Sequence, residues 1–157
     1  MAFQRALDLA LSQVEAQRLE TIISEHMRVH QLTQTRKAPS RRAIYRYFRA
    51  AGPAGVDVCL LSLADTLATY GPGLPADTWQ AELDVCRSLM EAWWERPSES
   101  VAPPRLLTGD DLMRSFGLQP GPQLGELLAA IREAQACGEI NDQKEALDFA
   151  RKYLKII

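Results

Sequence analysis

Apolar positions recur every three or four residues along most of this chain, which is the spacing of an amphipathic helix. The first such stripe consists of Leu19, Ile22, Ile23, His26, Met27 and His30. It follows Ser12 and Glu15, which are spaced as a capping box, so a helix is predicted from about residue 12 to residue 30. Similar patterns predict helices near residues 3–9, 40–52, 53–69, 77–95, 108–116, 122–137 and 141–155. Ser40 is expected to cap the second of these helices. The helix 77–95 is expected to bury one face, which consists of Trp79, Leu83, Cys86, Leu89, Met90 and Trp93. No stretch alternates as a strand would, and we therefore predict an all-α fold.

The segment 53–69 is the most apolar part of the chain. It is apolar nearly all round, which predicts a helix at the centre of a bundle. Its longest apolar run, residues 56–63, is too short to cross a bilayer, so no membrane partner is expected. Asp57 and Asp65 lie inside the segment 53–69, and a buried carboxylate has to be paired or hydrogen bonded. An arginine of a neighbouring helix, or His26, is the expected partner.

Residues 96–104, RPSESVAPP, are rich in proline and serine and have no periodicity. They predict a helical bundle at 1–96, a linker at 97–104 and a small helical tail domain at 105–157. In the tail, Thr108 and Asp111 are spaced as a capping box, Pro122 opens a helix, and Gly138 ends it. Asn141 or Asp142 is expected to cap the last helix.

Composition narrows the class of protein. The chain has 157 residues, 46% of them apolar, and a net charge of -2. Cys59, Cys86 and Cys137 are odd in number and widely spaced, which favours free thiols in a reducing compartment over disulfides. The first residues lack the long uncharged apolar core of a signal peptide. A cytoplasmic location is the resulting expectation.

Charge is segregated along the chain. Between His26 and Val56 there is no acidic residue, whereas seven basic residues occur there: Arg28, Arg36, Lys37, Arg41, Arg42, Arg46 and Arg49. Guanidinium groups suit phosphate oxygens, and Tyr45 and Tyr47 could stack on bases, so this region is the predicted nucleic-acid contact. Two alternatives remain open. The arginines could form a solvated face, or they could pair with the acidic helix 77–96 of the same chain or of a second copy in a homodimer.

Other candidate sites are weaker. His26 and His30 are four residues apart and could bind one metal ion together with Asp65, but Met27 stands where a zinc-protease helix has glutamate. Both histidines also fit the apolar stripe, so no metal is expected. At the hairpin 117–125, backbone N–H groups near Gln123 could bind a phosphate, although a plain Gly-Pro turn explains the pattern as well. No phosphate loop, serine elbow or paired catalytic carboxylates are present, and neither a catalytic residue nor a cofactor is predicted.

Two stretches resemble a known family. Residues 105–154 read RLLTGDDLMRSFGLQPGPQLGELLAAIREAQACGEINDQKEALDFARKYL and resemble the C-terminal end of class II CCA-adding enzymes and bacterial poly(A) polymerases. Upstream, HMRVHQL, PSRRAIYRYFRAAG and LLSLADTLATYG resemble the helical region of members that contain an HD-type domain. Together the resemblance covers most of residues 11–154.

The resemblance implies a role in tRNA processing. In that family the catalytic residues lie in an N-terminal head, and none of its motifs is present here, so activity of this chain by itself is not expected. Asp65 would correspond to the last metal ligand of an HD domain, whose other ligands are not found. The resulting hypothesis is a non-catalytic, tRNA-binding body and tail that works with a nucleotidyltransferase head in cis. The alternatives are a degenerate HD-type phosphohydrolase and a protein-interaction or dimerisation module.

Overall fold

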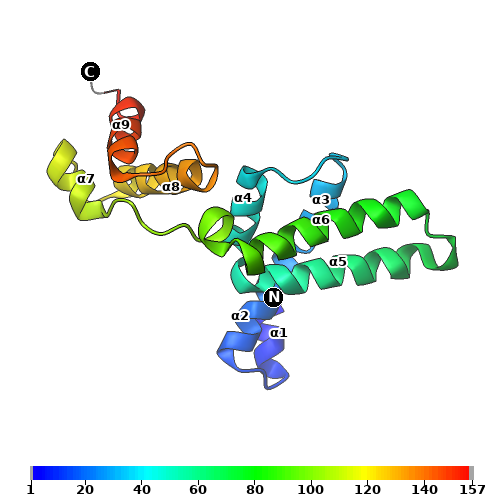
Figure 1. Ribbon diagram of the computed structural model, residues 1–157. Coiled ribbons are helices and arrows are strands. Elements are labelled where there is room, and N and C mark those ends of the chain that lie inside the picture. The colour runs from blue at the N-terminus through cyan, green and yellow to red at the C-terminus, as the bar shows by residue number, and fades with distance from the viewer. Residues whose placement is uncertain (1, 156–157) are drawn as a thin grey trace. The chain divides into compact units, whose positions relative to one another are not determined.

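A computed structural model describes residues 2–155 of the chain (Figure 1). Helices account for all of its regular structure, and these residues include no strand, which confirms the predicted all-α class. The chain divides into two compact units, residues 1–91 and 92–157, which are described separately below.

The first unit is built from six α-helices and two short 3₁₀ turns. They are α1 (Ala2–Asp8), α2 (Gln13–Glu25), α3 (Arg28–Thr33), α4 (Arg41–Ala51), η1 (Gly52–Ala54), α5 (Gly55–Tyr70), η2 (Gly71–Gly73) and α6 (Ala76–Glu95), whose last residues belong to the second unit. The predicted caps are confirmed. The side-chain oxygen of Ser12 accepts from the backbone N–H of Glu15, and that of Ser40 accepts from Ala43. Each cap satisfies a donor that the first helical turn leaves unpaired.

The helix predicted to run through His30 is broken. It ends at Glu25, and α3 begins at Arg28. The Nδ1 atom of His26 lies 2.6 Å from the carbonyl oxygen of Ile23, a contact by which a histidine ends the last turn of a helix. Ile23 and Met27 are each 46% exposed, so the predicted apolar stripe is wrong at these positions.

Helices α4 and α5 approach each other closely at Gly55. The hydroxyl of Tyr47 donates to the carbonyl oxygen of Gly55 at 2.7 Å. A Cβ atom at Gly55 would lie 2.9 Å from ring atoms of both Tyr47 and Phe48, closer than real Cβ contacts. The missing side chain therefore permits this crossing.

Helix α5 is not the buried centre of a bundle, contrary to the prediction. Its buried residues are mostly small or polar: Gly55, Val58, Cys59, Ser62 and Thr66. Leu60, Leu61 and Leu67 are 55%, 42% and 49% exposed. By length and composition the helical run 41–73 could cross a membrane, but the 3₁₀ turn η1 interrupts it and Arg41, Arg42, Arg46 and Arg49 lie in its first part.

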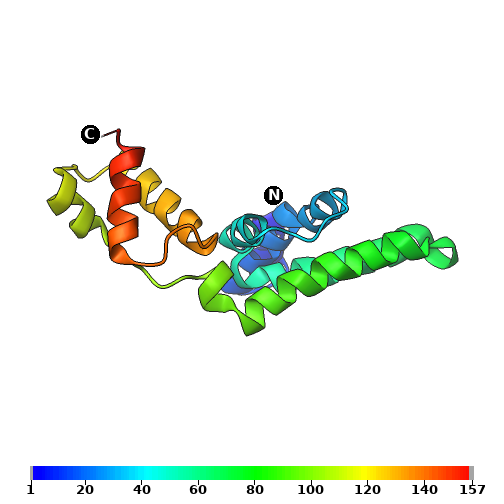
Figure 2. The ribbon, with the colours of Figure 1, turned by 45° about the horizontal axis from the view of Figure 1, so that its top comes forward.

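Helix α6 runs beside α5 as the second arm of a long hairpin, as both views show (Figures 1 and 2). Its buried face is rotated from the predicted one. Glu82, Val85, Cys86 and Leu89 are buried. Four of the residues predicted to face the core, Trp79, Leu83, Met90 and Trp93, are only partly buried. The rotation brings Glu82, which lies at one edge of the predicted face, fully inside the unit.

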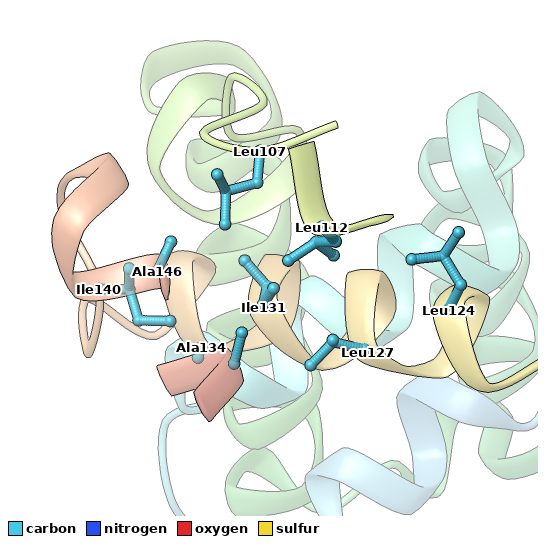
Figure 3. Packing of buried hydrophobic residues seen from close by; sticks show 9 residues of the cluster. Leu107, Leu112, Leu124, Leu127, Ile131, Ala134, Ile140 and Ala146 are labelled. Atoms are coloured by element: carbon cyan, nitrogen blue, oxygen red, sulfur yellow. The ribbon is translucent and has the colours of Figure 1, made fainter. Parts of the chain in front are cut away.

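The second unit contains a π-helical turn, η3 (Pro97–Val101), followed by α7 (Gly109–Phe116), α8 (Pro122–Ala136) and α9 (Gln143–Tyr153). The predicted Thr108–Asp111 capping box is present, Pro122 opens α8, and Asp142 caps α9. Figure 3 shows the apolar core that these helices enclose. It consists of Leu107, Leu112, Leu124, Leu127, Ile131, Ala134, Ile140, Ala146 and Ala150. Alanines let α8 and α9 pack closely.

Candidate nucleic-acid interface

A hollow of about 390 Å³ lies between α3 and α4 in the first unit. It is lined by Arg28, Gln31, Leu32, Ser40, Arg42, Ala43, Arg46 and Tyr47. Three of these residues are arginines and none is acidic. We call this site the arginine hollow. Its lining offers guanidinium N–H donors, which match the oxygens of a phosphate.

Local sequence explains how α4 presents its arginines. Ser40 caps the helix, and Ile44, Tyr47 and Phe48 anchor one side in the core, where each is less than 8% exposed. Arg42 and Arg46 are one helical turn apart, so they lie on the same exposed face. Buried residues therefore fix the rotation of α4 and turn the arginine face outward.

Arg28 completes the hollow from α3. Its Nε atom lies 2.7 Å from a carboxylate oxygen of Glu25, and its Nη1 donates to the backbone carbonyl oxygen of Arg46 at 3.4 Å. These two contacts hold the side chain of Arg28 across to α4. The arginine hollow is thus partly organised before any ligand is present.

The predicted RNA-contacting residues fall into several groups. Arg28, Arg42 and Arg46 come together in the arginine hollow, whereas Arg36 and Lys37 line a second and larger hollow. The remaining candidates, Arg41, Arg49 and Gln123, are exposed but line neither of these hollows, and Gln123 belongs to the second unit, in the first turn of α8. The seven basic residues therefore do not form one continuous cluster in a single hollow.

The predicted stacking of tyrosines on bases is wrong. Tyr45 and Tyr47 are only 6% and 1% exposed. Burial raises the pKa of Tyr47, and the neighbouring Cys59 raises it further. Both rings belong to the core, so they cannot serve as stacking surfaces.

The second hollow has a volume of about 1010 Å³ and lies among α3, α5, α6 and the connection 34–40. We call it the mixed hollow, because its lining contains charges of both signs. The charged residues are Arg36, Lys37, Arg87, Asp65, Asp77, Glu82 and Asp84, and His30 also lines it. Cations and anions therefore lie side by side in this lining, whereas the charged residues that line the arginine hollow are all cations.

Glu82 is a buried residue in the lining of the mixed hollow and was not singled out from the sequence. It is 2% exposed. Its carboxylate accepts from the hydroxyl of Thr33 at 2.9 Å and from the hydroxyl of Ser62, and its Oε1 lies 3.1 Å from Nδ1 of His30. The available signal was its position three residues after Trp79 and four before Cys86, on the face that the apolar pattern predicts to be buried.

His30 also faces Asp65 and Ser62. Its Nε2 atom lies 3.4 Å from Oδ2 of Asp65 and 3.5 Å from Oγ of Ser62. Serine, histidine and glutamate are the residue types of a nucleophilic triad, but Ser62 is 1% exposed and its hydroxyl donates to Glu82. This geometry therefore suits a structural network that joins three helices and does not suit attack on a substrate.

The other predicted roles were a metal site and an ion pair. Among residues 2–155, no three His, Cys, Asp or Glu side chains are grouped so that they could hold a metal ion, so His26, His30 and Asp65 are not brought together in this way. Asp57 is paired as expected with an arginine of a neighbouring helix, at 2.6 Å from Nε of Arg18.

The cysteines are free thiols, as predicted. Cys59 and Cys86 are buried, and Sγ of Cys86 donates to the backbone carbonyl oxygen of Cys59 at 3.7 Å. Hydrogen bonding to Cys59 and burial raise the pKa of Cys86. This thiol is consequently held in its protonated form.

Comparison with known proteins gives these sites a context. Residues 105–150, the core of the second unit, match the family described as tRNA nucleotidyltransferase domain 2. The chain is 37% identical over 97 residues to the A-adding tRNA nucleotidyltransferase of Deinococcus radiodurans, a match that covers 62% of this chain and 22% of that enzyme. It is 35% identical over 115 residues to the CC-adding tRNA nucleotidyltransferase of Geobacter sulfurreducens, covering 73% of this chain and 24% of that enzyme.

A third relative extends the match. The CC-adding tRNA nucleotidyltransferase of Thermus thermophilus is 30% identical over 133 residues, which are 85% of this chain and 27% of that enzyme. No solved structure matches the chain significantly. These similarities identify the chain as a region of the tRNA nucleotidyltransferase family, which confirms the resemblance to CCA-adding enzymes found in the sequence. The chain spans about a quarter of the length of the curated relatives it matches.

Proposed function

We propose that this chain is a non-catalytic RNA-binding region that positions tRNA for a nucleotidyltransferase domain. The observation on which the proposal rests is the arginine hollow, where Arg28, Arg42 and Arg46 meet without an acidic residue in the lining. The relatives are tRNA nucleotidyltransferases, which makes tRNA the natural choice among RNAs. The missing partner is the nucleotidyltransferase domain itself, supplied in the same polypeptide or by another chain.

The proposed mechanism is contact with the phosphate backbone. Guanidinium groups hold phosphate oxygens through charge-assisted hydrogen bonds, and such contacts fix the register of a nucleic acid without reading its sequence. Each neutralised phosphate releases counterions, so the affinity is expected to fall steeply as salt rises. Because Tyr45 and Tyr47 are buried, recognition is expected to depend on the shape of folded RNA.

Four further basic residues of the first unit lie outside the lining of the arginine hollow and would add exposed positive charge: Arg36, Lys37, Arg41 and Arg49. In the second unit, Gln123 is exposed in the first turn of α8, where backbone N–H groups have no intrahelical partner. We assign it a second and weaker phosphate contact. Its substitution should matter less than that of any arginine in the hollow.

The test is a titration of labelled tRNA with the full chain at two salt concentrations, with duplex DNA as competitor. Reversing charge at Arg42→Glu and Arg46→Glu should lower the affinity at least about 100-fold, because each reversal removes one phosphate contact and adds a repulsion. The matched control is Arg87→Glu, an exposed arginine of the mixed hollow whose side chain is 64% exposed and paired with Asp84.

Circular dichroism should show that all three variants keep their helices. Tight binding that ignores salt, or a loss that is as large for the Arg87 control as for the hollow variants, would contradict the proposal. Equal affinity for duplex DNA and tRNA would contradict the choice of tRNA.

A further inference from the structure

The outward side of α5 is more apolar than its inward side. Leu60, Leu61, Ala64, Leu67 and Ala68 are all exposed, and their spacing of one, three and four residues places them on one side of the helix. We call this set the outer stripe. It contains no charged residue. An ordinary helix of a soluble domain has the opposite arrangement, with its apolar side turned inward.

The hydrogen-bond network inside the first unit explains why the inward side of α5 is polar, but it does not explain why the outward side is apolar. Ser62 and Thr66 face inward because Ser62 donates to the buried carboxylate of Glu82, and Thr66 lines the mixed hollow. Nothing in that network requires leucines on the other side of the helix. The largest contiguous apolar patch on a monomer is often a functional surface.

We infer that the outer stripe is the docking surface for a nucleotidyltransferase domain. This inference rests on the part of the proposed function that gives the chain such a partner. The relatives have about three quarters of their length outside the matched stretch, so they contain ample protein to cover this face. The partner surface should itself be apolar and uncharged, and Ala64 at the centre of the stripe allows a close approach.

A second copy of the chain fits the stripe less well. Three half-exposed leucines and two alanines offer on the order of a few hundred Å², whereas a stable interface buries about 800 Å² on each partner. The stripe is therefore large enough to be the apolar centre of a wider interface but too small to hold a symmetric dimer. A bilayer fits less well too, because Asp65, whose side chain is 61% exposed, lies beside Leu61 at the edge of the stripe.

The experiment uses the full chain and a separate protein made from the part of the Deinococcus radiodurans A-adding enzyme that lies outside the 97-residue match. Sedimentation velocity of the mixture should show a one-to-one complex. Leu60→Glu and Leu67→Glu should each weaken it at least about tenfold, because each places a charge in a dry interface. The matched control is Val14→Glu on α2, an apolar residue that is 79% exposed outside the stripe, and it should bind like the wild type.

Both leucines are half exposed, so their replacement leaves the core intact, and helix content provides the check. Absence of a complex, equal weakening by Val14→Glu, a wild-type dimer that Leu67→Glu dissociates, or binding to vesicles of anionic lipid that Leu67→Glu abolishes would each overturn the inference. A parallel tRNA titration separates the two proposals. Leu67→Glu should leave tRNA affinity unchanged, whereas Arg42→Glu should lower it and leave the protein complex intact.

Discussion

The two hollows of the first unit differ in how their charges are balanced. In the mixed hollow, buried Glu82 accepts hydrogen bonds from Thr33 and Ser62 and faces His30, so its charge is compensated within the fold. In the arginine hollow the lining has three cations and no anion, although Glu25, outside the lining, pairs with Arg28. The first arrangement suits stability, because a buried carboxylate has to be paired. The second suits an external anion.

This difference separates polar residues that hold the fold from polar residues that are available to a ligand. By residue type alone, the mixed hollow would be the stronger candidate for a functional site, because it contains serine, histidine and carboxylates. Burial makes it the weaker candidate, since Ser62 and Glu82 are only 1% and 2% exposed. The exposed guanidinium groups of α4 are better placed to meet a partner.

Removing Glu82 should have the largest effect on stability. Glu82→Ala removes the acceptor of the buried Ser62 hydroxyl and one of the two acceptors near the Thr33 hydroxyl, and we expect the free energy of unfolding to fall by about 1–3 kcal/mol, the cost of leaving a buried polar group unsatisfied. Urea denaturation followed by circular dichroism measures this. Glu95→Ala, at the exposed end of the same helix, is the control and should change stability by less than about 0.5 kcal/mol. If Glu82→Ala had a similarly small effect, the mixed hollow would not have the stabilising role that separates it from the arginine hollow.

A single arginine of the hollow should affect binding without affecting stability. Arg42→Ala should lower tRNA affinity about tenfold at low salt and reduce the slope of log affinity against log salt by about 0.7–0.9, the contribution of one phosphate contact. Fluorescence anisotropy across a salt series provides both numbers. Arg87→Ala should leave the slope unchanged. If the two alanine variants gave the same slope, the assignment of a phosphate contact to Arg42 would be wrong.

The cap of α4 should affect both properties slightly. Ser40→Ala removes the acceptor for the N–H of Ala43 and should lower the free energy of unfolding by about 1 kcal/mol. Ser40→Asp keeps a capping oxygen but adds a negative charge to the lining of the arginine hollow. It should therefore retain stability and weaken tRNA binding. Weaker binding by the alanine variant than by the aspartate variant would contradict an electrostatic role for this hollow.

Asp111, which lies outside both hollows, is expected to make a small contribution to stability that is lost at acidic pH. Its carboxylate accepts from the hydroxyl and the backbone N–H of Thr108, and these hydrogen bonds lower the pKa of Asp111. A lowered carboxyl pKa stabilises the fold above the unfolded-state pKa, and that stability is lost as pH falls through the folded-state value. Thr108→Val should raise the pKa of Asp111 toward its ordinary value, measured by carboxyl NMR titration. Thr35→Val, in the first unit, should leave that titration unchanged.

The sequence predicted local structure better than packing. The caps at Ser12, Ser40, Thr108 and Asp142 are all present, because each depends on residues three positions apart. The buried side of α5 could not be predicted in this way. A helix that is apolar nearly all round has no preferred face, and the side of α5 that turns inward holds Ser62, whose hydroxyl donates to the buried Glu82 on α6.

The candidate site was predicted in part. The absence of acidic residues around α4 pointed to Arg28, Arg42 and Arg46, which do line one hollow. Tyr45 and Tyr47 next to them were misassigned, because their burial depends on the helices packed around α4 and, for Tyr47, on the close approach of Gly55. Arg36 and Lys37 lie in the same basic run, but the chain folds them toward the mixed hollow.

The close crossing at Gly55 fixes the distance between two surfaces of the first unit. The Tyr47 hydroxyl is bound to the Gly55 carbonyl oxygen, and no methyl group fits between the two helices, so the angle between α4 and α5 has little freedom. The arginine face belongs to α4 and the outer stripe belongs to α5. A polynucleotide on one helix and a protein domain on the other would be held at a constant separation, and this corner of the molecule would act as a ruler between them.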